Sequence, residues 1–279
     1  MATRDHENTF ATYEKLGFVL TPLSIHQWSN KPGEPIRPSG SANRCAMFRG
    51  NYLEITAQIS EGAAGKSQIR RARWLERYEG LHIICFNSEE MTGVDVRLRE
   101  AGFTTTGVVA LERDVDTPEG KRTAKFERVL FAESEEPEEF VQVAHHLTPQ
   151  VVFQERYMTH PNKAIALSDV ICCVSDPDEY ESKYTRITGR PAVRRGVKRV
   201  ISLPLSRVTI VSPGDLGQVI PGASAPSLPY IAGLGLVSED LGAVDRLLSE
   251  REIPADKVDG KIIVAASTAC GAAVIFESA

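Results

Sequence analysis

Hydrophobic residues follow two different spacings along the chain. Val94 and Leu98 stand four positions apart in a polar background, which places them on one face of an amphipathic helix. The runs 81–86 (LHIICF) and 169–174 (DVICCV) are apolar and contain β-branched residues, but they are too short for buried helices. These runs therefore predict strands, and the sequence combines both kinds of element.

The two patterns recur in the same order in four segments of the chain. In each segment an amphipathic stretch ends at a glycine or another helix-breaking residue and is followed by strand-like runs. The amphipathic stretches are residues 9–18, 90–103, 177–189 and 239–252. A unit repeated at this scale predicts a repeat architecture. We expect an α+β fold of four βαβββ modules, with mixed, curled sheets and the helices outside.

Residues that favour helix ends lie at the borders of these stretches. Acidic or hydroxyl side chains accept hydrogen bonds at an N-cap, and glycine adopts the left-handed conformation that often follows a helix. The candidates are Glu89, Asp176 and Ser238 as N-caps, and Gly17, Gly102 and Gly189 as C-caps.

The length of 279 residues suits two domains of roughly 100–150 residues each. Two stretches rich in small or breaking residues, 62–73 and 212–229, are predicted linkers between modules. The stretch 158–163 (MTHPNK) is predicted to divide the chain into two halves. The expected domains are therefore residues 1–160 and 161–279.

Charge and composition exclude some classes of function. The net charge is −5 with acids and bases interspersed, which argues against nucleic-acid binding. The one basic run, 190–199, is either a solvated turn or strand edge or an anion-binding patch. No apolar run approaches the roughly 20 residues of a membrane-spanning helix, and we expect no membrane partner. Because the five cysteines are odd in number, lack a CxxC motif and lie mostly in apolar runs, we expect reduced thiols and a cytoplasmic protein.

Several short strings carry a resemblance to a known family. In chain order they are 13–18 (YEKLGF), 51–55 (NYLEI), 146–149 (HLTP) and 160–162 (HPN). With the module pattern, they resemble the glyoxalase-like group of the vicinal oxygen chelate superfamily, which includes glyoxalases, extradiol dioxygenases and bleomycin-resistance proteins. The resemblance implies that the four modules pair into two glyoxalase-like halves. Beyond about residue 180 it rests on the module pattern alone.

The same resemblance implies a metal-assisted chemistry. In such a half, two modules form a cup whose first and last strands supply His, Glu or Gln ligands to a divalent ion, Zn, Ni, Fe or Mn. The ion acts as a Lewis acid. The implied function is a metal-dependent lyase, isomerase or dioxygenase that acts on a small oxygenated molecule in the first-half cup. The alternative is a metal-free small-molecule-binding protein of the same fold, as resistance proteins are.

Three residues of the first half match the family's ligand positions. His82 precedes the glycine that ends the second helix by the family's spacing, and Glu54 is the glutamate of NYLEI. Alignment of 140–144 on 52–56 places Gln142 opposite Glu54. Each also has an ordinary interpretation: Glu54 in a structural ion pair, His82 as a core histidine and Gln142 as a strand glutamine.

The remaining ligand positions are incomplete. The first module's equivalent of His82 falls before Met1, so we expect a shortened first strand or a reading frame that starts further upstream. A shortened strand exposes a sheet edge, which favours a homodimer or a short remnant strand in residues 1–5. The second half offers only Asp169 and Glu277, too few for a transition metal. We therefore expect the site in the first half.

Glu54 is also the predicted catalytic base. Paired with a histidine, it would take a proton from a carbon next to a bound carbonyl group, and His146 is its predicted catalytic partner. His26, Asn43 and His160 are predicted to contact the substrate. For His160 a turn is the competing interpretation, because a residue before proline is held extended and Asn suits the left-handed region.

Overall fold

The computed structural model describes residues 1–28, 37–59, 66–132, 135 and 140–279. Its elements follow the order strand, helix and three strands four times, as predicted. The first module consists of β1 (Ala2–Thr3), α1 (His6–Lys15), β2 (Ser24–Trp28), β3 (Arg37–Met47) and β4 (Tyr52–Gln58). The second consists of β5 (Ile83–Asn87), α3 (Met91–Glu100), β6 (Val109–Thr117), β7 (Gly120–Leu130) and β8 (Phe140–His146).

The second half repeats this order. The third module consists of β9 (Ala164–Cys173), α5 (Pro177–Thr188), β10 (Ala192–Arg195), β11 (Lys198–Ser202) and β12 (Arg207–Val211). The fourth consists of β13 (Tyr230–Ser238), α7 (Leu241–Glu250), β14 (Asp256–Val258), β15 (Lys261–Val264) and β16 (Ala273–Ser278). Between modules lie α2 (Lys66–Arg77), α4 (Pro149–Val152), the 3-10 turn η2 (Glu155–Tyr157) and α6 (Leu216–Val219).

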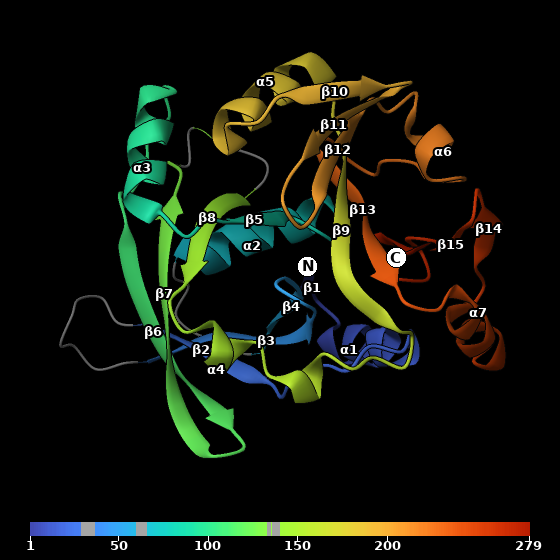
Figure 1. Cartoon of the computed structure of the whole chain (residues 1–279), viewed down its shortest axis with the longest axis horizontal. Helices are drawn as coiled ribbons and strands as arrows, with labels where there is room; N and C mark the ends of the chain where they lie inside the picture. The colour runs from blue at the N-terminus through green and yellow to red at the C-terminus, as the bar shows by residue number, and fades with distance from the viewer. Residues whose placement is uncertain (29–36, 60–65, 133–134, 136–139) are drawn as a thin grey trace.

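Every module has the same strand order, in which the first strand lies beside the last. In the second half the first strands β9 and β13 pair antiparallel and join two modules into one eight-stranded sheet, β10-β11-β12-β9-β13-β16-β15-β14. In the first half the sheets are β1-β4-β3-β2 and β5-β8-β7-β6. Helices α1, α3, α5 and α7 lie at the outside (Figure 1). The α+β fold of curled, mixed sheets with outer helices is therefore confirmed.

The junction between the first two modules is much smaller than that between the last two. Strand β1 is two residues long, as expected of a short remnant. Its contact with the second module is a single antiparallel bridge, in which Ala2 and Gly80 exchange N–H···O bonds of 2.7 and 3.1 Å. The first half therefore keeps two separate four-stranded sheets where the second half has one continuous sheet.

The helix ends agree with the sequence to within one or two residues. Asp176 caps α5 and Gly189 ends it in the left-handed conformation, with φ of 68°. The caps of α3 and α7 are Glu90 and Asp240, rather than the predicted Glu89 and Ser238. Gly17 and Gly102 follow the last helical residues of α1 and α3 at positive φ, where glycine is tolerated without strain.

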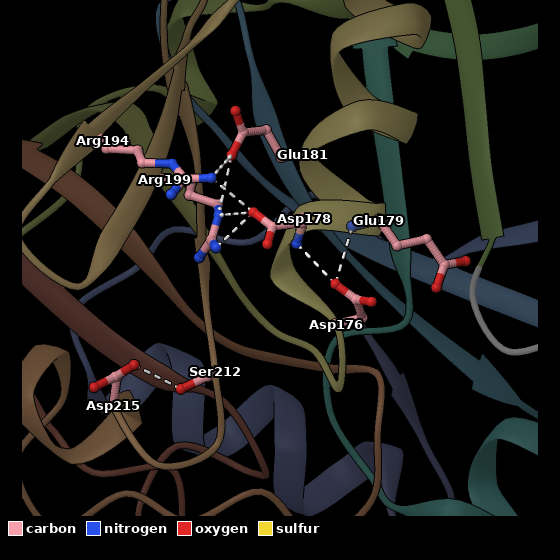
Figure 2. Close-up of polar contacts among 8 residues, drawn as sticks. All are labelled: Asp176, Asp178, Glu179, Glu181, Arg194, Arg199, Ser212 and Asp215. Atoms are coloured by element: carbon pink, nitrogen blue, oxygen red, sulfur yellow. Dashed lines mark hydrogen bonds and ion pairs between the residues drawn. The ribbon is translucent and has the colours of Figure 1, made fainter.

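The basic run 190–199 forms the hairpin of β10 and β11 and holds α5 in place (Figure 2). Arg194 and Arg199 each place an Nη2 atom 2.7 Å from Asp178 Oδ1, and Arg199 Nε lies 3.0 Å from Glu181 Oε2. At the helix start Asp176 Oδ1 accepts N–H bonds of 2.9 and 3.1 Å. The pairing of Arg194 and Arg199 with α5 agrees with the strand-edge interpretation of the run.

The stretch 212–229, predicted to be a linker, packs against the second-half sheet. It contains α6, whose Leu216 is buried together with Ile220. They cluster with Ile171, Cys173 and other apolar side chains on the sheet face opposite to α5 and α7. The concave face of the second half is therefore filled with apolar side chains. No described helix has the length and apolar character needed to cross a membrane.

Candidate functional site

The two four-stranded sheets of the first half face each other. Tyr52 of β4 lies against His146 of β8, with ring centroids 5.8 Å apart, and against Phe153 at 6.2 Å. Glu54 of β4 is also close enough to Cys85 of β5 to raise the pKa of its thiol. The sheets thus enclose one space, which we call the first cup.

Alternation along the strands decides which side chains face the first cup. On β4, Leu53, Ile55 and Ala57 are buried in the core shared with the helices, so Tyr52 and Glu54 face the opposite side. The same alternation and the strand registers give the other cup-facing side chains, which are Asn43, Cys45, Cys85, Arg113, Phe126, Arg128, Gln142 and His146.

The Glu54 carboxylate is held through one oxygen. Asn43 Nδ2 donates to Oε1 at 2.6 Å, and His26 Nε2 lies 3.7 Å from the same atom. His26 Nδ1 in turn lies 2.9 Å from the hydroxyl of Ser41. Burial lowers the pKa of His26 despite the nearby Glu54, so the imidazole is neutral at pH 7 and does not form an ion pair. Within the described part of the chain no side chain bonds Glu54 Oε2.

Cys85 and Gln142 lie opposite each other on the parallel strands β5 and β8. The Cys85 side chain is exposed to solvent, yet burial raises its pKa to about 12. Because the thiol stays protonated at pH 7, it is neither an activated nucleophile nor a ready thiolate ligand.

An aromatic wall closes one side of the first cup. His146 lies against Tyr52, Phe126 and Phe153, with the last two centroids at 5.2 and 5.3 Å. Burial, helped by Arg113, lowers the pKa of His146 to about 4, so its ring is neutral at pH 7.

Three arginines lie near the cup, Arg71 close to Glu54, Arg113 close to His26 and Arg128 close to Cys85. Arg71 of α2 is 7% exposed and donates through Nη1 to the Ala57 carbonyl at 3.2 Å. Burial lowers the pKa of Arg71 and of Arg128, and a guanidinium remains charged at pH 7 even so. Arg113 lies near enough to affect the pKa values of both His26 and Tyr52.

Buried polar atoms without a partner gather in this cup. Among the described residues they include Arg71 Nε, Arg128 Nε, Gln142 Oε1 and His146 Nε2. Each such atom costs on the order of 1–3 kcal/mol when it is left without a hydrogen bond. Four of them around one space indicate a site built for a polar ligand.

Comparison with known proteins agrees with this architecture. The family model described as a glyoxalase-like domain matches residues 1–188. The chain belongs to the glyoxalase-like domain family. No curated protein shows significant sequence similarity to it.

Solved structures share the fold of this glyoxalase-like protein at low sequence identity. A hypothetical protein from Staphylococcus aureus is 12% identical, with a TM-score of 0.58 over 92% of this chain and 90% of that chain. A mutant 4-hydroxymandelate synthase from Streptomyces coelicolor is 14% identical, with a TM-score of 0.58 over 99% and 90%. A xylose isomerase-like TIM barrel/4-hydroxyphenylpyruvate dioxygenase fusion protein is 8% identical, with a TM-score of 0.56 over 99% of this chain and 48% of that chain. These likenesses show the fold of the glyoxalase-like chain.

The structure does not bring His82 to Glu54. The His82 ring stacks on Trp74 and Tyr78, with centroids 5.7 and 4.0 Å away, and its Nε2 lies 2.9 Å from the Tyr78 carbonyl. Burial lowers its pKa to about 4. Cys85, three residues later, is the side chain of this segment that faces the cup.

His160 also lies outside the first cup. Its Nδ1 accepts the Val19 N–H at 2.9 Å, and its Nε2 donates to the Met47 carbonyl at 2.8 Å. The ring is 2% exposed and packs edge-on against Phe18 and Phe48. Both nitrogens join neighbouring chain segments, and this arrangement leaves none for a substrate. Of the other predicted substrate contacts, His26 and Asn43 do lie beside Glu54.

In the second half Asp169 and Glu277 lie close together, and both bind the guanidinium group of Arg207. Arg207 Nε donates to Asp169 Oδ2 at 2.7 Å, and Nη2 donates to both Glu277 oxygens at 3.0 and 3.1 Å. Lys261 Nζ lies 3.0 Å from Glu277 Oε2. The two carboxylates are therefore neutralised by side chains of the chain itself.

The described donors do not form a complete metal site. No group of three or more His, Cys, Asp or Glu side chains is placed to hold a metal in the described ranges. The first cup presents one carboxylate and a protonated thiol beside three guanidinium groups. Divalent ions need deprotonated donors and are repelled by neighbouring cations, so this set does not fit such an ion well.

Arg71, Arg113, Arg128 and Cys85 were not predicted as site residues. Arg71 lies in the stretch 62–73, which the sequence suggested to be a linker and in which α2 in fact begins. The alternation of Gln142 and Arg128 with buried Val141 and Val129 was the available signal for a cup-facing side.

Proposed function

We propose that the first cup binds a small oxygenated molecule and that Glu54 acts on it as a general base, in an isomerase- or lyase-type reaction. The observation that carries the proposal is the set of four unpartnered buried polar atoms in the same cup as a carboxylate whose Oε2 atom is bonded by no side chain of the described residues. The family supplies the fold but no specific activity.

The arrangement of Glu54 suits proton transfer. Asn43 fixes the carboxylate through Oε1 and leaves Oε2 to accept a proton from a substrate carbon next to a carbonyl group. The neutral imidazole of His26 can take up or return a proton near the same oxygen. Gln142 Oε1 can accept a hydrogen bond from a substrate hydroxyl group, and Nε2 of the neutral His146 can donate to or accept from a substrate oxygen, depending on its tautomer.

Exchange of substrate protons for deuterium tests this role of Glu54. Small 2-oxo acids and hydroxyketones are incubated with the protein in D2O, and proton NMR follows their exchangeable C–H groups. We expect exchange that is lost in Glu54→Gln and kept in Glu112→Gln, which removes an exposed carboxylate from β6. Exchange at an unchanged rate in Glu54→Gln would refute Glu54 as the base.

A metal-dependent lyase, isomerase or dioxygenase is the second candidate. Glu54 and Gln142, two residue types that ligate metals, face the same cup. Stoichiometric Zn, Ni, Fe or Mn in protein purified without chelators would favour it. Binding of small molecules with no exchange in any of them would instead favour a metal-free binding protein.

A further inference from the structure

We infer that the ligand of the first cup is an organic anion, and that Arg71, Arg113 and Arg128 provide the positive charge that holds it. This inference rests on the proposed function in one respect, that the first cup binds a small molecule. It adds the chemical class of that molecule and assigns recognition to three residues.

The charges that face the first cup are unbalanced. Three guanidinium groups stand against one carboxylate, Glu54, an excess of two positive charges (3 − 1) among the described cup-facing side chains. The whole chain carries a net charge of −5, so the cup is a local positive region in an acidic protein. A cleft lined by one sign of charge concentrates ligands of the opposite sign.

The arginines also have donors to spare. Arg71 uses Nη1 on the Ala57 carbonyl, while its buried Nε has no partner, and the buried Nε of Arg128 has none either. No ion pair within contact distance is formed by these three arginines in the described ranges. A carboxylate accepts two parallel N–H bonds from a guanidinium and is the natural partner for such unsatisfied donors.

The second half shows the same recognition with both partners present. Arg207 lies opposite Asp169 on the paired strands β12 and β9, and it bonds Asp169 and Glu277 together. Asp169 lies eight residues before the start of α5, and the residue eight before the start of α3 in the second module is Ile83, which pairs with Phe140. There the strand position of Asp169 is held by an uncharged side chain. In the first cup the chain supplies guanidinium groups without matching carboxylates, and a bound anion would complete the set.

The test compares carboxylates with their own primary amides. Acetate, benzoate, succinate and phenylpyruvate are titrated against amides of the same shape by calorimetry, using protein treated with a chelating resin. We expect at least one carboxylate to bind about tenfold or more tightly than its amide, with affinity that falls as salt increases. Equal affinity within every pair, or no binding by any carboxylate, overturns the inference.

Two arginine variants and a matched control locate the charge. Arg113→Gln and Arg128→Gln should each weaken the carboxylate about tenfold or more and leave the amide unchanged. Lys125→Gln removes one positive charge from the opposite face of β7 and should change neither. Circular dichroism checks that each variant is folded. Unchanged carboxylate binding in both arginine variants overturns the inference. Carboxylate binding that occurs only after a divalent ion is added back to the chelator-treated protein overturns it as well.

Glu54→Gln separates this inference from the proposed base. Removing the carboxylate should abolish deuterium exchange and tighten carboxylate binding, because a negative charge leaves the cup. If the variant loses deuterium exchange but amides bind as tightly as carboxylates, Glu54 is supported as the base and the inference of an anionic ligand is refuted. If the variant binds carboxylates more tightly but still exchanges deuterium, the anionic ligand is supported and Glu54 is refuted as the base.

Discussion

Replacement of Arg207 by methionine is predicted to destabilise the second half strongly. Arg207 makes three hydrogen bonds to two carboxylates, one of which is almost fully buried: the Asp169 side chain is 9% exposed. Without Arg207, Glu277 keeps Lys261 and Ser168 as partners, whereas Asp169 keeps, among the described side chains, only the Thr209 hydroxyl at 3.0 Å. The variant therefore leaves one buried charge poorly compensated.

The size of the effect follows from the burial of the partners. Removing one member of a buried ion pair costs about 3–5 kcal/mol. Because the Arg207 side chain is itself 33% exposed, water screens part of the interaction, and we expect a cost below this range, about 2–3 kcal/mol. Methionine preserves most of the apolar stem, so lost packing contributes little.

The penalty should also depend on pH. Burial raises the pKa of Asp169 in the folded protein, and Arg207 opposes this rise. In the variant that opposition is gone, so the folded-state pKa of Asp169 increases further. A raised folded-state pKa destabilises the fold at neutral pH, and this penalty shrinks as the pH falls through that pKa. The effect on Glu277 has the same sign. Arg207 helps to lower the pKa of Glu277 in the folded protein, which stabilises the fold at pH values above the ordinary pKa of Glu, and the variant loses this contribution.

Urea unfolding followed by circular dichroism between pH 7.5 and pH 4.5 measures both effects. Lys257→Met is the matched control, since it breaks an ion pair of 2.7 Å whose members are 63% and 40% exposed and should cost about 0–1 kcal/mol. A further variant, Arg207→Met with Asp169→Asn, should recover part of the loss. A penalty no larger than that of Lys257→Met, or one independent of pH, would show that the two carboxylates do not depend on Arg207.

The remaining predictions concern individual side chains of the first half. His82→Phe should change the free energy of unfolding by about 1 kcal/mol or less in urea titrations, because the lost bond to Tyr78 is offset by removal of the unpartnered Nδ1. Its metal content should match that of the unmodified protein, and a loss of bound metal would restore His82 as a ligand. Cys85 should react with iodoacetamide at pH 7.5 on the order of 1,000-fold more slowly than an ordinary thiol, since its pKa is about 12 rather than 9.0. Rapid alkylation of Cys85, located by peptide mass spectrometry, would contradict that protonation state.

The sequence predicted the modules because their periodicities are long and repeated, and the family resemblance predicted Glu54 as the glutamate of NYLEI, a choice with which the burial of its neighbours agrees. Leu53 and Ile55 must face the helices, so Glu54 must face the cup. His82 was chosen by spacing from a distant glycine, and spacing does not determine the phase of a strand. A shift of one residue moves a side chain to the other face, and here Cys85 rather than His82 faces the cup.

Arg71 and Arg113 could not be found by the same means. Strand β6 carries polar residues on both faces through much of its length, so its sequence does not show which face is inside. Arg71 depends on α2, which begins in a stretch rich in small residues and packs through Trp74 and Leu75, near its C-terminal end. Tertiary contacts between sheets, rather than local pattern, bring the three guanidinium groups together.

The two halves show how one module pattern can serve different purposes. In the second half α6 and its neighbours fill the concave face with apolar side chains, and Arg207 is matched by Asp169 and Glu277. In the first half the corresponding space keeps unpartnered polar atoms, each of which costs stability on the order of 1–3 kcal/mol. A chain can tolerate such groups where binding of a ligand compensates them, provided that other regions are well packed. On this reasoning the filled half supplies stability, and the polar, charge-unbalanced half is where we propose that a ligand binds.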